Sequence, residues 1–134
     1  MFQKYAEAHS DKIYFIFRVV VGLLFAQHGA QKLLGWFGGI NGGTVELFSL
    51  LGLAGVIELV GGLLIALGLF TSFGAFFGVL DMLGAWFTFH IKNGWIPIVN
   101  GGELALLFLV SFLAILAYGP GKWALGRKFS KDLS

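Results

Sequence analysis

Five side chains that can transfer protons or bind metals are spread over a very apolar sequence of 134 residues. They are His28, Lys32, Glu58, His90 and Glu103. Imidazole and carboxylate groups act as general acids and bases, and they also ligate iron, zinc and manganese. His28 and Lys32 are four residues apart, so a helix would place both on one face. These residue types indicate proton transfer or ligand binding, provided that the fold brings them together.

The spacing of these residues leaves open which ligand they would bind. Two histidines on different helices are suited to haem ligation. The same pair could hydrogen-bond the carbonyl groups of a quinone, with Glu58 as the proton partner. No Glu-x-x-His pair occurs, which disfavours a di-iron site of the ferritin type. The sequence has no cysteine, and this excludes disulfides, thiolate metal sites and dithiol chemistry.

The elements that must position these residues are membrane-spanning helices. Hydrophobic residues make up 57% of the chain and charged residues only 12%, against roughly a quarter in soluble domains. Four apolar segments, each close to the ~20 residues that cross a bilayer, cover residues 13–34, 47–70, 73–91 and 103–118. We therefore expect an all-α integral membrane four-helix bundle that forms one domain over residues 1–134, with the lipid bilayer as its surroundings.

The distribution of basic residues predicts the orientation of this bundle. One side carries six lysines and arginines, and the other carries Lys32 and Lys92. The six are Lys4, Lys12, Lys122, Arg127, Lys128 and Lys131. Because basic flanks stay on the cytoplasmic side, we expect both termini in the cytoplasm. These basic residues flank apolar segments and do not form a phosphate-binding face, so we expect no nucleic-acid partner.

Ionisable groups are costly inside a membrane and should face one another or a wet cavity. Counting ~1.5 Å per residue from the nearer end of each segment predicts two layers. His28 and Glu58, about 9 and 12 Å deep, belong to the outer layer, together with Lys32, His90, Asn100 and Glu103. Arg18 and Asp81, about 8 and 12 Å from the inner boundary, form the inner layer. We expect these two to make a buried structural ion pair.

Several motifs resemble those of the DoxX family, and the resemblance covers nearly the whole chain. They are Arg18-x-x-x-Gly22, His28-Gly29-x-Gln31-Lys32-Leu33, Gly35-Trp36-Phe37-Gly38-Gly39, Glu58 with Gly61, Gly62 and Gly68, Met82 with His90, Asn100-Gly-Gly-Glu103 and Gly119-Pro120-Gly121. The resemblance implies a four-span inner-membrane protein. Relatives are described as candidate membrane oxidoreductase components, including the small-subunit type of thiosulfate:quinone oxidoreductase. Some associate with proteins that handle oxidative or thiol stress.

The leading hypothesis is therefore an integral membrane subunit of a redox system. A quinone would bind near the outer leaflet, with His28 and Glu58 handling its protons and Lys32 stabilising a developing quinol anion. His90, Asn100 and Glu103 would complete the cofactor pocket. Haem or a metal is an alternative cofactor, although we expect no dedicated metal site. A different class of function is a non-catalytic membrane scaffold, acting with a redox partner or as a homo-oligomer. A proton or small-molecule pathway is disfavoured by the apolar gap between the two layers.

Overall fold

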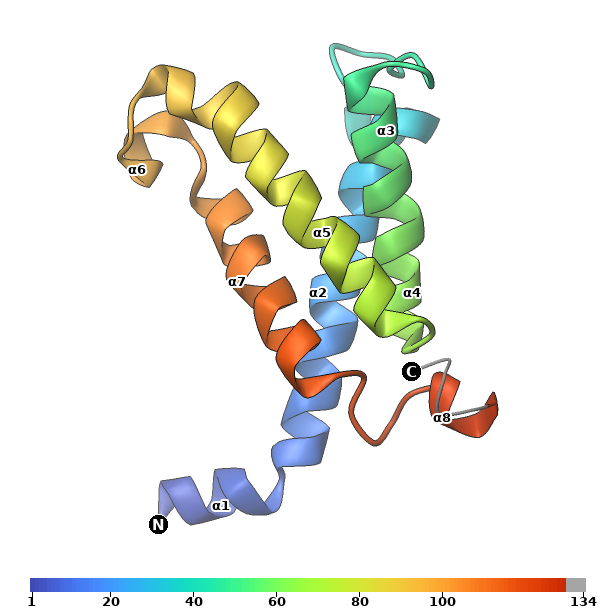
Figure 1. Cartoon of the computed structure of the whole chain (residues 1–134), viewed down its shortest axis with the longest axis vertical. Coiled ribbons are helices and arrows are strands. Elements are labelled where there is room, and N and C mark those ends of the chain that lie inside the picture. Colours follow the sequence, from blue (N-terminus) through green and yellow to red (C-terminus); the bar gives the residue numbers. More distant parts are fainter. Residues whose placement is uncertain (130–134) are drawn as a thin grey trace.

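The computed structural model describes residues 1–129, and this part of the chain is helical with short connecting loops (Figure 1). The four longest helical segments of residues 1–129 run up and down the molecule in alternating directions (Figure 1). They are α2 (Ser10–Leu34), the continuous segment α3 (Leu50–Val56), η2 (Ile57–Gly61) and α4 (Gly62–Leu67), the segment α5 (Thr71–Ala85), η3 (Trp86–His90) and η4 (Ile91–Asn93), and α7 (Glu103–Tyr118). The short elements are α1 (Phe2–Ala8), η1 (Trp36–Gly38), α6 (Pro97–Asn100) and α8 (Gly126–Phe129).

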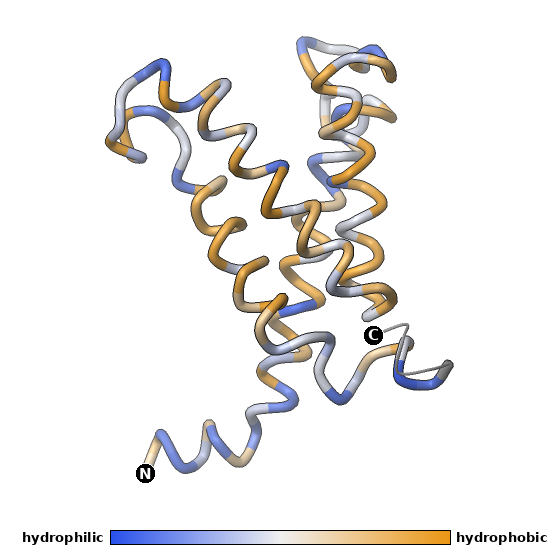
Figure 2. Tube along the Cα trace, viewed as in Figure 1, coloured by the Kyte–Doolittle hydropathy of each residue, from blue (hydrophilic) through white to orange (hydrophobic). Residues whose placement is uncertain are grey.

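Three of the long segments are long and apolar enough to cross a membrane: Ser10–Leu34, Leu50–Leu67 and Thr71–Asn93. The fourth, α7, is apolar but has only 16 residues, or about 24 Å of helix. Apolar positions dominate all four segments, and polar positions gather at their ends (Figure 2). The predicted all-α membrane fold is therefore confirmed, whereas four crossings and cytoplasmic termini stay predictions. Lys131, which entered the charge count, lies outside the described residues.

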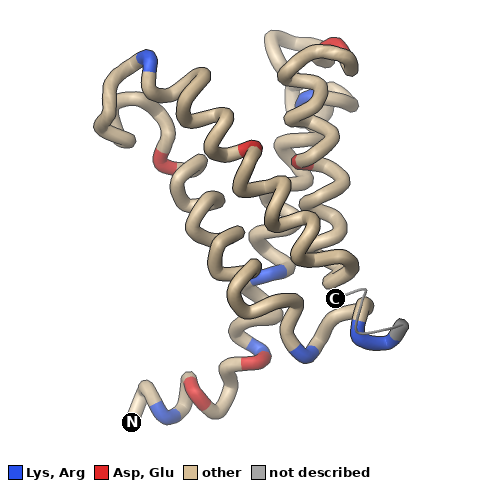
Figure 3. Tube along the Cα trace, viewed as in Figure 1, with Lys and Arg blue, Asp and Glu red and all other residues tan. Residues whose placement is uncertain are grey.

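Elements α1 and α8 lie at the end of the bundle where α4 turns into α5, which we call the terminal end (Figure 1). The connections between α2 and α3 and between η4 and α7 lie at the opposite end, which we call the loop end (Figure 1). Most charged positions lie near one of the two ends, and few occur along the helices (Figure 3). This arrangement suits helices whose middle parts face hydrocarbon.

Helix α2 packs directly, backbone to backbone, against the antiparallel segment α3–η2–α4. Gly22 faces Gly62, and Gly29 faces Gly55, so two glycines seven residues apart on one helix meet two on the other. A Cβ atom on Gly22 would lie 2.5 Å from the Ala66 nitrogen. Small residues allow such close approach, which drives helix association in lipid.

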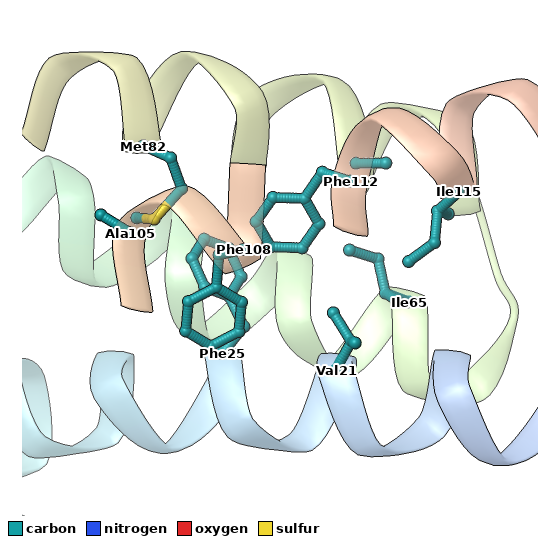
Figure 4. Packing of buried hydrophobic residues seen from close by; sticks show 9 residues of the cluster. Val21, Phe25, Ile65, Met82, Ala105, Phe108, Phe112 and Ile115 are labelled. Carbon is teal, nitrogen blue, oxygen red and sulfur yellow. The ribbon is translucent and has the colours of Figure 1, made fainter. Parts of the chain in front are cut away.

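The remaining helices, α5 and α7, close the bundle around an aromatic core. Phe25 of α2 meets Phe108 and Phe112 of α7 at ring-centre distances of 5.3 and 4.6 Å (Figure 4). Phe112 also packs against Gly78 of α5, where a Cβ would lie 2.7 Å from its ring. These contacts hold α7 and α5 together at the centre of the bundle.

The Arg18 guanidinium organises the terminal end, and its partners are backbone carbonyls. Its Nε donates to Ile65 O at 2.9 Å, and its Nη2 donates to Ala66 O at 3.2 Å and Trp123 O at 3.1 Å. Its Nη1 donates to Pro120 O. Ile65 and Ala66 belong to the last turn of α4, whose carbonyls lack the usual partner four residues on, although the Gly68 N–H donates to Ile65 O at 3.1 Å. Arg18 thus caps α4 and holds the segment that follows α7 against the end of α4.

The predicted ion pair between Arg18 and Asp81 is therefore wrong. Arg18 is 1% exposed and its donors are occupied by carbonyl oxygens at the terminal end. A helix C-terminus carries partial negative charge and attracts a cation without any acidic side chain. Counting charged residues cannot reveal such a partner.

Candidate functional site

A half-open cavity of about 660 Å³ lies between the segment α3–η2 on one side and α5–η3 with α7 on the other. Most of its wall is apolar, with phenylalanines from three helices: Phe25, Phe77, Phe89 and Phe108 among them. Five ionisable side chains line the same wall: His28, Lys32, Glu58, Asp81 and His90. The cavity therefore combines an apolar volume with acids, bases and a cation at membrane depth.

Lys32 and Glu58 form a buried ion pair across the interface of α2 and η2. The Lys32 Nζ donates to Glu58 Oε2 at 2.8 Å and to Oε1 at 3.0 Å. Their side chains are only 14% and 6% exposed. Removing two charges from water is costly, so the pair depends on this close geometry. The direct partner of Glu58 is thus Lys32.

Asp81 of α5 faces the same cavity, and its charge interacts with both Glu58 and Lys32. Its Oδ2 is buried and has no hydrogen-bond partner among the described residues. A buried polar atom without a partner is uncommon and often marks a functional position. The sequence had placed Asp81 in a separate inner layer with Arg18, and this is wrong.

The error in the layers came from measuring depth from different boundaries. Glu58 is nine residues from the end of α4 at Leu67, or about 14 Å, and Asp81 is ten residues from the start of α5 at Thr71, or about 15 Å. Measured from the terminal end, both lie near the middle of the bundle. The helices carrying them pack against each other, so one polar layer replaces the predicted two.

His28 lies on α2 one turn before Lys32, and it is half-buried in the cavity wall. Its ring meets the Phe108 ring edge to face, with centroids 5.9 Å apart. His90 reaches the same cavity from the other side, at the end of η3. Its Nδ1 lies 3.2 Å from the Asn100 carbonyl oxygen, which fixes the ring orientation. The two histidines thus belong to opposite walls.

Two residues expected in the cofactor pocket, Asn100 and Glu103, are not part of the cavity wall. The Asn100 side chain donates to Gly94 O at 2.9 Å and accepts from Gly102 N at 2.8 Å. It holds the loop that connects η4 to α7. Glu103 is exposed in the first turn of α7, where a negative charge favours the helix dipole.

Two π-helical turns, which the sequence pattern did not predict, present site residues to the cavity. Turn η2 contains Glu58, and turn η3 ends at His90. A π-helical turn widens the backbone by one residue and is frequent at functional sites. Because hydrophobic periodicity tolerates one extra residue, the sequence carried no clear signal for either turn.

The donor set of the cavity suits proton exchange better than metal binding. Within residues 1–129, no three or more histidine and acidic side chains gather as ligands around one point. Lys32 already occupies the oxygens of Glu58. What remains directed at the cavity is two imidazoles, a carboxyl group and the ammonium end of an ion pair, all of which exchange hydrogen bonds with oxygen ligands.

Comparison with known proteins identifies similar bacterial sequences. The DoxX family profile matches residues 13–91. An uncharacterized protein of Haemophilus influenzae is 42% identical over 118 residues, covering 85% of this chain and 88% of that protein. An uncharacterized membrane protein of Mycobacterium tuberculosis is 30% identical over 131 residues, covering 85% and 79% of the two chains. The Bacillus subtilis protein CatD, named as a candidate oxidoreductase, is 30% identical over 111 residues, covering 78% and 77%. No solved structure matches.

Proposed function

Since the chain belongs to the DoxX family, we propose that it is a membrane-embedded subunit of a redox system and binds a quinone in the half-open cavity. The observation that carries this proposal is the combination of a largely apolar cavity inside the bundle with an ion pair and two imidazoles on its wall. A relative named as a candidate oxidoreductase supports the redox assignment.

The size and polarity of the cavity fit a quinone. A volume of about 660 Å³ falls within the range of small-molecule sites. The phenylalanine-rich wall suits the flat ring, and the half-open shape lets an isoprenoid tail continue into the lipid. A quinone carries two carbonyl oxygens, which accept hydrogen bonds. The Lys32 ammonium and the His28 ring are donors at the cavity wall. The Asn100 carbonyl oxygen accepts the Nδ1–H of His90, so His90 donates to the ligand through Nε2 only when its ring is protonated.

Each polar residue then has a role in the two-electron reduction of the quinone. Lys32 stabilises the negative charge that develops on one oxygen, as a buried cation does more strongly than one in water. His28 and Glu58 handle the two protons. Because the chain has no cysteine, the electrons come from a partner subunit. The proposal places the protein in the bacterial inner membrane, with four crossings and both termini in the cytoplasm.

Equilibrium binding of a short-chain ubiquinone and a short-chain menaquinone to the purified protein in nanodiscs tests this function. We expect the wild type to bind one of them and Glu58→Gln to bind it about ten- to a hundredfold more weakly, because the change loses a charged hydrogen bond and releases Lys32. Glu103→Gln makes the same chemical change outside the cavity and should bind like the wild type. Absence of binding to the wild type refutes the proposal, and a Soret band in its absorbance spectrum would favour haem.

A scaffold is the second candidate function, and the hydrogen bonds of Arg18 favour it. Four carbonyl contacts of Arg18 fix the terminal end without any catalytic purpose. In a scaffold, the Lys32–Glu58 pair would fix helix register in the same way. Glu58→Gln would then reduce folding and recovery of a partner complex, while no quinone would bind to the wild type.

A further inference from the structure

A second, smaller hollow adjoins α2 and shares one residue with the large cavity. It has a volume of about 190 Å³ and is lined by Gln27, His28, Gln31 and Phe37. Within the described residues, His28 is the only ionisable side chain that lines both spaces. Lys32, Glu58, Asp81 and His90 line the large cavity alone.

The hollow lies between His28 and the loop end of the bundle. His28 is six residues before the end of α2 at Leu34, or about 9 Å. Gln27 is exposed and Gln31 is half-buried, one helical turn apart. An amide side chain facing hydrocarbon loses its hydrogen bonds at a cost of several kcal/mol. A small space lined by two amides and an imidazole is polar and large enough for water.

Phe37 lines this hollow in a backbone conformation that favours glycine, and the residue is 69% exposed. Its φ and ψ are 56° and 33°, although it is a bulky residue. Positions 38 and 39 of this loop are glycine, whereas position 37, whose conformation is strained for a bulky residue, carries an aromatic side chain. The ring of Phe37 packs edge to face against Trp36, with ring centroids 6.2 Å apart.

We propose that the hollow is a water-filled inlet and that His28 passes protons between this water and the ligand of the large cavity. The proposal of an inlet depends only on the residues that line the hollow, whereas the identity of the proton acceptor depends on the proposed quinone function. The open side of the large cavity meets acyl chains, which supply no protons. Protons therefore enter through the imidazole from the loop end.

The reaction balances with a quinone as acceptor. Two electrons from the partner subunit enter the ring, and two protons convert both carbonyl oxygens to hydroxyl groups. For a proton that travels through His28, the ring nitrogen at the hollow takes a proton from a hydronium ion, which leaves a water molecule there. The opposite ring nitrogen gives its hydrogen to a quinone oxygen, and the O–H bond forms. The neutral ring then carries its hydrogen on the nitrogen that faces the hollow, so a flip of the ring precedes the next transfer.

Because the sequence has no cysteine, labelling of cysteines introduced one at a time tests the inlet without any quinone. A thiol ionises to its reactive thiolate only where water reaches it. Gln31→Cys in nanodiscs should therefore react with a charged, membrane-impermeant thiol reagent. Leu24→Cys is the matched control, since Leu24 is 41% exposed on the same helix but lies outside the hollow, and it should not react.

Two results of this labelling experiment would overturn the inlet. Equal reactivity of Gln31→Cys and Leu24→Cys would mean that the hollow is no wetter than the lipid-facing surface. Disulfide cross-linking of Gln27→Cys between two copies of the chain would mean that a second copy covers the hollow.

The labelled protein then tests the proton transfer itself. A bulky charged group on Gln31→Cys should leave the quinone affinity unchanged but slow proton uptake on reduction of the bound quinone by at least about tenfold. Dithionite supplies the electrons, a pH-sensitive dye reports the uptake, and unlabelled Gln31→Cys is the control. An unchanged rate would refute the relay through His28. If the wild type binds no quinone, the proposed function fails while the labelling experiment still decides whether the inlet exists.

Discussion

Replacing Lys32 with methionine removes the cation that faces both carboxyl groups of the large cavity. Lys32 donates two hydrogen bonds to Glu58 and also interacts with the charge of Asp81. Methionine keeps the length and the apolar stem of the side chain but carries no charge. The variant therefore leaves two neighbouring acidic groups inside the bundle without a counter-charge.

The burial of the pair sets the size of the expected effect. With side chains 14% and 6% exposed, water cannot replace the lost partner. We expect Lys32→Met to lower the free energy of unfolding by about 3–5 kcal/mol, as when one partner of a buried pair is removed. Glu58→Gln should cost less, about 1–3 kcal/mol, because Asp81 still faces Lys32. The double variant should cost less than the sum of the two single changes, since neither an unpaired cation nor an unpaired Glu58 carboxylate remains and only Asp81 lacks a counter-charge.

Reversible unfolding in mixed micelles with increasing dodecyl sulfate, followed by circular dichroism, measures these differences. Lys92→Met is the matched control: Lys92 is exposed in η4, and its change should stay within about 0.5 kcal/mol. The reasoning fails if the effects of Lys32→Met and Glu58→Gln simply add in the double variant. It also fails if Glu58→Gln is the more damaging single change, because Asp81 would then not support Lys32.

Two further predictions concern packing and the terminal end. Gly22→Ala should destabilise the protein by about 1–3 kcal/mol in the same unfolding assay, because its Cβ would lie 2.5 Å from a backbone nitrogen. Gly84→Ala is the control: nothing lies within 4 Å of its Cβ, so the change should be neutral or stabilise the protein by up to about 1 kcal/mol. Arg18→Gln should make chymotrypsin cleavage after Trp123 faster by about tenfold or more, because several charged hydrogen bonds hold this segment. Lys12→Gln, at an exposed position of the same helix, should leave cleavage unchanged, and equal cleavage rates for the two variants would contradict the anchoring role of Arg18.

Much of the fold could be predicted because lipid leaves the chain few alternatives. Apolar segments of ~20 residues must be helical to satisfy their backbone, so the predicted segments 47–70 and 73–91 correspond closely to Leu50–Leu67 and Thr71–Asn93. The many glycines of the sequence also allow helices to approach closely in lipid, and Gly22 and Gly62 meet in this way. Composition and glycine spacing are enough for this level of structure.

The cavity was predicted only in part, because it depends on how the helices cross. The structure places His28 and Glu58, named from the sequence for proton transfer, in one cavity with Lys32 and His90. Asp81 was assigned to the wrong layer, because depth counted along a straight axis depends on the chosen boundary. The helix-capping role of Arg18 was missed since its partners are carbonyl oxygens, which every residue has and no pattern distinguishes.

Arg18 and Lys32, the two buried cations of residues 1–129, differ in their surroundings. The hydrogen bonds of Arg18 all go to carbonyl oxygens of the terminal end, it is 1% exposed, and it does not line the large cavity. A charged side chain with a purely structural role is expected to have its donors hydrogen-bonded in this way, because every unpaired buried donor costs free energy. Lys32 instead forms an ion pair with Glu58 at the wall of an open cavity that Asp81 also lines, and the buried Asp81 Oδ2 has no hydrogen-bond partner among the described residues. A scaffold gains nothing from leaving that oxygen unsatisfied, whereas in a site that exchanges protons such an oxygen can take up a proton.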